Sequence, residues 1–277
     1  MADAITLSTV QQTSLVARER IASVRNAATE ALSTGRSVNR ATDDARAYLL
    51  SKGLSDRADD LLAAKSEIFQ GIDTLVAVKT GIKAIDRLTR QLTGIAEAAR
   101  SANTADRADF ARQFDTVRQQ IDLLAADVSY QGVNLLSNPA DTLRVGLSDN
   151  AGSNLEVQGR ASDVSSLGIN EASTSYANFV SDNDIDNALT ALGNARANLR
   201  ASEASIVGNT SILQTRGDFT DNLANVLQGS ANRLVEADLN AESARILSAN
   251  ARDALSLEGQ RISANSESQI AQLLKGA

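Results

Sequence analysis

Adjacent acidic side chains are the first residues in this sequence that could do chemistry. Asp43 precedes Asp44, and Asp59 precedes Asp60. Two carboxylates can act as a general acid and base only when they converge in a cleft that perturbs their pKa values. Neighbouring residues of a helix point in different directions, so helix caps or solvated faces account better for both pairs.

A second group of oxygen-bearing side chains gathers between positions 148 and 154. Asp149, Asn150 and Asn154 are residue types that bind calcium, but their spacing departs from that of an EF-hand loop, and a hairpin turn is the better interpretation. The chain contains no His and no Cys, so it lacks the commonest general base and any thiolate ligand. We therefore expect no enzyme activity, no catalytic residues, no cofactor and no metal site.

The composition favours long helices. Of the 277 residues, 43% are hydrophobic, only 3% are aromatic and one is proline, which costs about 3 kcal/mol inside a helix. The net charge of −7 argues against a nucleic-acid surface. No apolar run is long enough to cross a membrane or to form a cleaved secretion signal. A cytosolic protein and one exported without a cleaved signal are both allowed.

Both ends of the chain carry an apolar repeat of about seven residues. Such a repeat predicts a helix with a narrow apolar seam, which a second helix of the same chain or of another copy must cover. We interpret the two ends as helices that need each other, with seams formed by Leu7, Val10, Ala17, Ile21, Val24 and Ala28 at the start and by Ala244, Leu247, Ala251, Leu255, Ile262, Ile270 and Leu273 at the end.

Three further helices are predicted between these ends. The first terminal helix should stop near Gly35, and a polar connector should lead to a second helix near Ser55 or Asp56, with Thr42 or Asp43 as a candidate cap. A third helix should end before Gly132. A fourth should open after Asp182 or Asp184 and run towards the last seam, with possible kinks at Gly208, Gly217 and Gly229.

The repeat changes to strict alternation in the middle of the chain. Leu143, Val145 and Leu147 alternate with other residues, as do Leu155 and Val157 beyond a polar turn, which predicts a β-hairpin. A hydroxyl-rich stretch follows, and we expect it to lie on an outer surface. Bare solvated hydroxyls and sites of bacterial O-glycosylation are equally compatible with Ser162, Ser165, Ser166, Ser173, Thr174, Ser175 and Ser181.

Several segments closely resemble bacterial flagellins, and alphaproteobacterial members most of all. At the start these are Asp3-Ala4-Ile5-Thr6-Leu7-Ser8 and the segments 32–44, 53–61 and 81–85. Tyr130-Gln131-Gly132-Val133-Asn134-Leu135-Leu136-Ser137 matches the family's approach to its hairpin, and the segment 234–244 matches its carboxy-terminal signature. The resemblance covers roughly 1–158 and 184–277.

The resemblance implies a mainly α fold, in which both termini form a long-helix coiled-coil bundle beside a helical layer with one β-hairpin. It also implies that the seam residues of both terminal helices form the interface between neighbouring subunits. It divides the chain into a terminal helical-pair core (1–45 with 236–277), a helical outer layer (46–136 with 183–235) and a hairpin with a surface loop (137–182). The space after the hairpin is short, so the large outer domains of many relatives are expected to be absent.

The resemblance also implies a function. It predicts a secreted structural subunit that self-assembles into the extracellular flagellar filament for swimming motility, without nucleic-acid binding or membrane insertion. The implied partners are the flagellar type III export apparatus, a flagellin chaperone, the filament cap and hook-associated proteins. Two other hypotheses are a hook-filament junction protein with similar terminal helices and a cytosolic coiled-coil adaptor. The segments 32–44 and 236–244 favour the filament subunit. The segment 92–100 lacks the stretch that animal flagellin receptors read.

Overall fold

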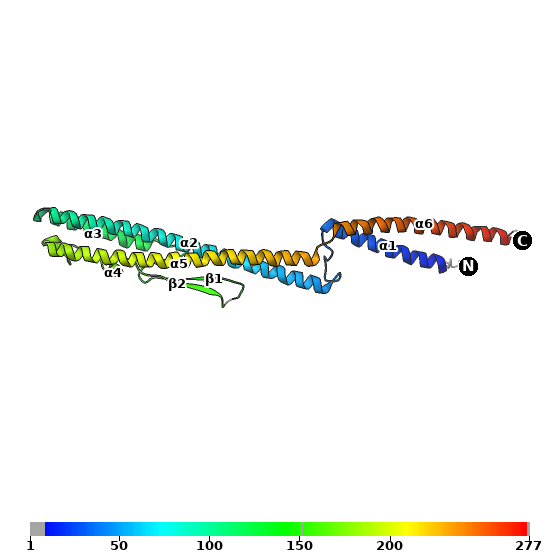
Figure 1. Cartoon of the computed structure of the whole chain (residues 1–277), viewed down its shortest axis with the longest axis horizontal. Coiled ribbons are helices and arrows are strands. Elements are labelled where there is room, and N and C mark those ends of the chain that lie inside the picture. Colours follow the sequence, from blue (N-terminus) through cyan, green and yellow to red (C-terminus); the bar gives the residue numbers. More distant parts are fainter. Residues whose placement is uncertain (1–8, 151, 276–277) are drawn as a thin grey trace, which may run out of the picture. The chain divides into compact units, whose positions relative to one another are not determined.

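The computed structural model describes residues 9–150 and 152–275, which are mainly α-helical as expected. Figure 1 shows the elements in chain order: α1 (Thr9–Thr34), α2 (Ala45–Ser101), α3 (Thr104–Asp127), β1 (Thr142–Gly146), β2 (Asn154–Gln158), α4 (Val164–Leu167), the 3-10 helix η1 (Ala177–Phe179), α5 (Asp182–Val235) and α6 (Leu239–Lys275).

The chain divides into two compact units. The terminal unit comprises 1–56 and 227–277, and the central unit comprises 57–226. The terminal unit takes in more of the chain than the expected 1–45 and 236–277, because the first turns of α2 and the last turns of α5 cluster with it.

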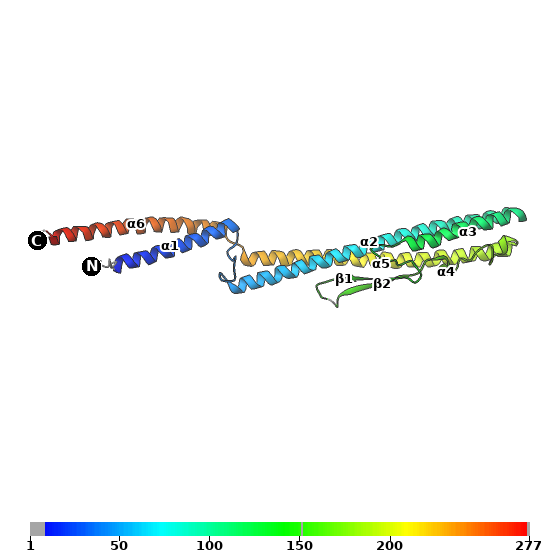
Figure 2. The ribbon, with the colours of Figure 1, turned by 180° about the vertical axis from the view of Figure 1, so that it is seen from behind.

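In the central unit, α2 and α5 lie side by side and run antiparallel, with α3 along α2 (Figures 1 and 2). Ion pairs mark their register: Lys65 lies 2.7 Å from Asp221, and Arg196 lies 3.3 Å from Asp86. The seven-residue repeats predicted for these helices supply the core. Its largest fully buried side chains are Phe114, Phe179, Ile68, Leu75, Ile82, Ile85, Leu92, Ile121, Leu135, Leu136, Ile169 and Ile185.

The second helix begins earlier than the sequence suggested. It was expected near Ser55 or Asp56, but α2 starts at Ala45. Asp44 supplies the reason, because its Oδ1 accepts the backbone N–H of Ala47 at 2.9 Å and so satisfies an amide that the first turn leaves without a partner.

Asp43, one of the two residues predicted to cap this helix, holds the connector instead. Its Oδ2 accepts the backbone N–H groups of Asn39, at 3.0 Å, and of Arg40, at 2.9 Å. These two backbone hydrogen bonds hold the pKa of Asp43 below its ordinary value, because they stabilise the charged carboxylate. The polar segment between α1 and α2 is thus organised by one exposed side chain.

The predicted hairpin is present, and a glycine of α2 makes room for it. Leu143 pairs with Val157 and Val145 with Leu155 across the two strands. Val145 packs so closely against α2 that a Cβ built on Gly71 would lie 2.6 Å from its Cγ2 atom. The glycine in the middle of the helix is therefore needed for close approach of the hairpin.

The predicted kinks in the fourth helix are wrong. The helix α5 continues without a break from Asp182 to Val235 and includes Gly208, Gly217 and Gly229. A glycine in a helix interior costs only about 0.5–1 kcal/mol relative to alanine, which the burial of the surrounding apolar residues offsets. The break before the last helix lies at 236–238 instead.

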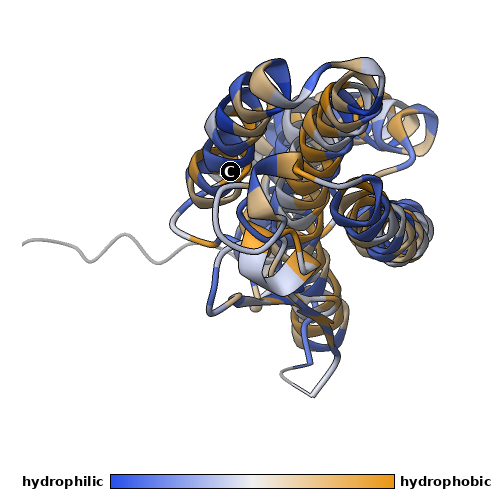
Figure 3. Cartoon of the chain, turned by 90° about the vertical axis from the view of Figure 1, so that its left-hand side faces the viewer, coloured by the Kyte–Doolittle hydropathy of each residue, from blue (hydrophilic) through white to orange (hydrophobic). Residues whose placement is uncertain are grey.

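The hydropathy pattern of the helices agrees with this packing. Figure 3 shows hydrophobic and hydrophilic residues interleaved around them, as expected for helices that bury one side only. Among the described residues, no helix is both long enough and apolar enough to cross a membrane.

Candidate subunit interface

In the terminal unit, α1 and α6 lie side by side and run antiparallel, so the first residues of α1 lie towards the last residues of α6 (Figures 1 and 2). One stripe of each helix is covered, at steps of three and four residues. Within 12–34, the buried or half-buried residues of α1 are Ser14, Arg18, Ile21, Ala22, Arg25, Ala28 and Ala31. Within 239–266, those of α6 are Glu242, Ile246, Ala249, Asp253, Ser256, Gln260 and Ser263.

The covered stripe of α6 is largely polar. Arg18 Nε lies 3.3 Å from Asp253 Oδ1, and the amide of Gln260 donates a hydrogen bond to the Ser14 hydroxyl. Polar contacts that remain partly exposed contribute no more than about 1 kcal/mol each. The association of α1 with α6 inside one chain therefore rests on little apolar burial.

The apolar stripe predicted for the last helix is not covered by α1. Leu247 is 72% exposed and Leu255 is 74% exposed. Ala244, Ala251, Ile262 and Ile270 are exposed too. The two seams therefore do not cover each other within one chain, which was one of the two arrangements that the sequence allowed, because α6 turns its polar stripe to α1.

The seam predicted for the first helix is split between the two sides of α1. Ala28 is buried and Ile21 is half-buried, whereas Ala17 is exposed and Val24 is 51% exposed. Leu7 lies outside the described residues, as do the side chains of Val10 and Leu273.

An open groove of about 520 Å³ runs between α1 and α6 and brings several predicted seam residues together. Its lining is mainly apolar in accessible area and carries three arginines. The residues are Arg20, Ile21, Val24, Ala241, Ala244, Arg245, Ser248, Ala249 and Arg252. A groove of this kind can accept an apolar helix face whose flanks carry carboxylates.

Backbone hydrogen bonds join the segment that follows α1 to the segment between α5 and α6. Gly35 ends α1 with a φ of +70°, a conformation that favours glycine. Its carbonyl accepts the N–H of Ala237 at 3.0 Å, and Ser37 donates its N–H to the carbonyl of Val235 at 2.7 Å. These bonds join 35–38 to 235–237 and fix the point from which α1 and α6 both extend.

Asp149, in the group of side chains considered for calcium, has structural partners, as Asp43 and Asp44 do. Asp149 lies 3.0 Å from Arg57 Nε, and Ser148 donates its hydroxyl to Asp149. The Ser148 hydrogen bond, followed by the Arg57 guanidinium, holds the pKa of Asp149 below its ordinary value. Across the described parts of the chain, no three His, Cys, Asp or Glu side chains are grouped so that they could hold a metal ion.

Comparison with known proteins bears on these paired terminal helices. Residues 6–141 match the family model described as the bacterial flagellin N-terminal helical region. Flagellin FljK of Caulobacter vibrioides is 27% identical over 246 residues, which cover 88% of each chain. A flagellin of Brucella melitensis is 23% identical over 255 residues, which cover 88% of this chain and 89% of the relative.

The chain belongs to the bacterial flagellins. The crystal structure of Bacillus cereus flagellin superposes with a TM-score of 0.48 at 15% identity, over 56% of this chain and 88% of the other. Flagellins are structural proteins and not an enzyme family. This flagellin is a short form, in which only α4, η1 and their connections lie between β2 and α5.

The hydroxyl residues singled out in this flagellin differ in accessibility. Ser162 is 1% exposed and donates its hydroxyl to the carbonyl of Arg160 at 3.0 Å, so we remove it from the candidate acceptors of a glycan. The remaining candidates are exposed: Ser165, Ser166, Ser173, Thr174, Ser175 and Ser181. Ser181 is also engaged, because its Oγ donates to Asp184 Oδ2 at 2.7 Å at the start of α5.

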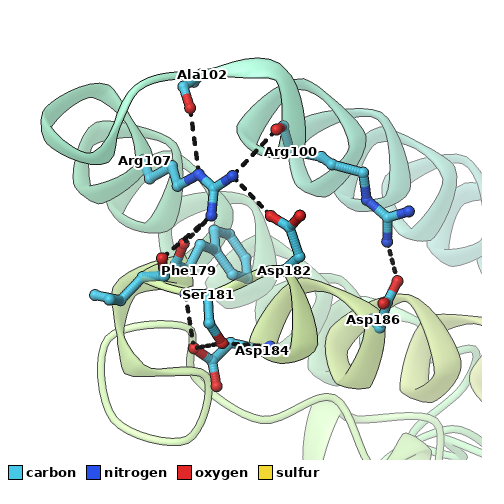
Figure 4. A network of polar contacts seen from close by, with 9 residues as sticks. Arg100, Ala102, Arg107, Phe179, Ser181, Asp182, Asp184 and Asp186 are labelled. Carbon is cyan, nitrogen blue, oxygen red and sulfur yellow. Dashed lines mark hydrogen bonds and ion pairs between the residues drawn. The ribbon is translucent and has the colours of Figure 1, made fainter.

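Sequence reasoning missed Arg107, which ties three elements of the central unit together (Figure 4). Its guanidinium donates to the carbonyls of Arg100, at 3.2 Å, and Val180, at 3.1 Å, and pairs with Asp182 at 2.7 Å. These partners belong to the end of α2, the segment after η1 and the start of α5. Because most of its acceptors are backbone carbonyls, which every residue type carries, no spacing of residue types could reveal the network.

The network encloses a strained turn. Ala177, Asn178 and Phe179 have φ values of 44°, 55° and 59°, in the left-handed region that costs L-residues roughly 1–2 kcal/mol each. The burial of Phe179, whose ring meets that of Phe114 edge-on at 5.5 Å, and the Arg107 hydrogen bond to Val180 hold the turn in place.

Proposed function

We propose that this chain is the structural subunit that self-assembles into the bacterial flagellar filament, outside the cell, and that neighbouring subunits meet through α1 and α6. One observation carries the proposal: the apolar stripe of α6 is left exposed by its own chain. Leu247, Leu255 and Ile262 repeat at intervals of seven or eight residues on this stripe, as in a helix that packs against other helices.

The burial energetics support a contact between copies. Covering apolar surface contributes about 25 cal/mol per Å², and fully burying one leucine contributes about 1.5–3 kcal/mol. Burying the stripe on α6 against a neighbour would therefore contribute several kilocalories per mole of stabilising free energy that the free subunit does not gain. The groove beside Ile21 and Val24 gives the helix of a neighbour a place to pack. In this proposal the exposed seam residues are contacts between subunits, as the resemblance to flagellins implied.

The export apparatus, chaperone, filament cap and hook-associated proteins implied by the family belong to the same proposal. A filament subunit has to be exported and added at a growing end, and these partners would serve those steps. The terminal unit, the helices of the central unit and the hairpin with its following loop would then form successive layers from the centre of the filament outwards.

A matched pair of substitutions on α6 tests the interface. We expect Leu247→Asp to abolish seeded filament growth, because a carboxylate without a partner is costly to bury. The control Asn250→Asp adds the same charge at another exposed position of the helix and should polymerise. Because Leu247 is 72% exposed, the free subunit should keep its circular dichroism spectrum.

Sedimentation and electron microscopy of seeded subunits supply the readout. Long filaments from the wild-type chain are expected of a filament subunit, whereas a junction protein should not elongate and an adaptor should form discrete oligomers. Normal filaments from Leu247→Asp would refute the role of the exposed stripe.

A further inference from the structure

Two apolar stripes remain exposed on the central unit, apart from the terminal helices. Leu62, Phe69 and Val76 form the α2 stripe, and Ile212, Phe219 and Val226 form the α5 stripe. All six side chains are between 45% and 61% exposed. Scattered apolar residues are ordinary on a protein surface, but three at strict seven-residue spacing on each of two helices form the repeat that helices use to pack.

The two stripes lie on different sides of the α2–α5 pair. The ammonium of Lys65 lies 5.8 Å from the centre of the Phe69 ring and 2.7 Å from Asp221 Oδ1, so Asp221 marks the side of α5 that borders the α2 stripe. Asp221 follows Phe219 by two residues, which rotates the two side chains about 160° apart on a helix of 3.6 residues per turn. The α5 stripe is therefore turned away from the α2 stripe.

The hairpin leaves the α2 stripe free. Gly71 is the residue of α2 that the hairpin meets through Val145, and it follows Phe69 by two residues. The same rotation of about 160° places Phe69 on the side of α2 away from this contact.

We propose that the α2 stripe of one copy packs against the α5 stripe of a second copy. The inference rests on the proposed polymer and adds a second contact to it, in the central unit. Two different patches on different sides of a molecule make a heterologous contact, which builds an open helical polymer when the rotation between copies does not close a ring. Because both stripes repeat every seven residues, apolar side chains still meet when the copies are shifted by whole heptads.

Charge complementarity supports this pairing of the α2 stripe with the α5 stripe. Asp73 follows Phe69 by four residues and Arg216 precedes Phe219 by three, so each exposed charge lies one turn from the central phenylalanine of its stripe. When the two helices run antiparallel with Phe69 opposite Phe219, the carboxylate that follows one phenylalanine lies towards the guanidinium that precedes the other, which favours the contact.

Photo-crosslinking between copies tests the contact. Benzoylphenylalanine is placed at the position of Phe69, the variant is mixed with subunits of the wild-type sequence labelled with ¹⁵N, and the mixture is polymerised from seeds and irradiated. Mass spectrometry should find crosslinks that join light to heavy chains and end in α5 between 209 and 229. The control places the probe at Asp60, which is exposed and about half a turn from Phe69 on α2, and should lack these crosslinks.

A reciprocal probe at the position of Phe219 should crosslink to α2 of another copy, and it decides the result if the probe at Phe69 blocks growth. Polymers in which both probes react only within their own chain, or with other elements, would overturn the inference and leave the filament function standing. Failure of the wild-type chain to polymerise at all would instead overturn the proposed function, and this contact with it.

Discussion

Replacing Gly71 by alanine should destabilise the central unit, whereas the same replacement at Gly94 should stabilise it. Both glycines lie in α2, where alanine is favoured by about 0.5–1 kcal/mol because glycine loses more backbone entropy on folding. They differ in what a methyl group would meet. A Cβ at Gly94 has no atom of another element within 4 Å, but at Gly71 it would lie 2.6 Å from Val145 Cγ2 and 3.3 Å from Leu213 Cδ1.

The cost at Gly71 follows from the rigidity of the hairpin. Val145 is 3% exposed and branched at Cβ, so it cannot rotate its methyl groups away without meeting other buried atoms. Overpacking of this kind costs about 1–3 kcal/mol. After subtraction of the helix-propensity gain, Gly71→Ala should lower the free energy of unfolding by about 1–2 kcal/mol, and Gly94→Ala should raise it by about 0.5–1 kcal/mol.

Thermal unfolding followed by circular dichroism measures both variants against the wild type. For a unit of this size, 1 kcal/mol corresponds to roughly 2–4 °C in Tm, so the two alanines should shift Tm in opposite directions. The double variant Gly71→Ala with Val145→Ala should lose less stability than the sum of the two single changes, because removing the valine methyls opens room for the new one.

A Gly71→Ala chain as stable as Gly94→Ala would refute this reasoning. It would mean that the hairpin does not press on α2 at this position. Additive losses in the double variant would contradict the same contact from the other side.

Three further outcomes are expected. Arg107→Ala should lower the stability of the central unit by about 2–4 kcal/mol, measured by urea unfolding, because carbonyls of separate elements lose a charged donor. The pKa of Asp43 is lowered in the folded chain, so its contribution to stability is complete above the ordinary value of 3.8 and is lost as the pH falls through the lowered value. Hydrogen exchange of the backbone N–H groups that donate to Asp43 should therefore accelerate in acid. Asp43→Asn should remove this pH dependence. Val24→Cys should react with a maleimide in the free subunit and be protected in filaments, whereas Asn150→Cys should react in both; equal labelling of the two in filaments would contradict the proposed layers.

Much of the fold could be predicted from local periodicity in the sequence. The repeat through Phe114 and Ile121 predicted α3, and the alternation of Leu143 with Val145 predicted a strand, because side-chain direction along a helix or strand is set by the backbone alone. The start of α2 was misjudged because Thr42 or Asp43 was expected to cap the helix, whereas Asp44 bonds its first turn. Which carboxylate bonds the helix and which bonds the connector depends on the path of the chain.

The pairing of α1 with α6 marks the limit of sequence reasoning. The apolar stripe through Leu247 and Leu255 was visible in the sequence, but its burial partner was not. A second stripe, through Ile246, Asp253 and Gln260, repeats with the same period and is the one that α1 covers. Periodicity predicts that one face of a helix can be buried. Which of two candidate faces is buried within the chain depends on the partner helix, which a single sequence does not display.

The polar pairing of α1 with α6 has a physical consequence for assembly. Ordering a residue costs about 1–2 kcal/mol of backbone entropy, and contacts such as that between Arg18 and Asp253 return at most about 1 kcal/mol. A chain that buried Leu247 and Leu255 within itself would be more stable alone and would have less to gain from a neighbour. Leaving them exposed makes the terminal helices depend on other copies, so we expect their stability to rise when the polymer forms. Amide exchange within 12–34 and 239–266 should therefore be fast in the free subunit and slow in filaments, and equal protection in both states would contradict this coupling.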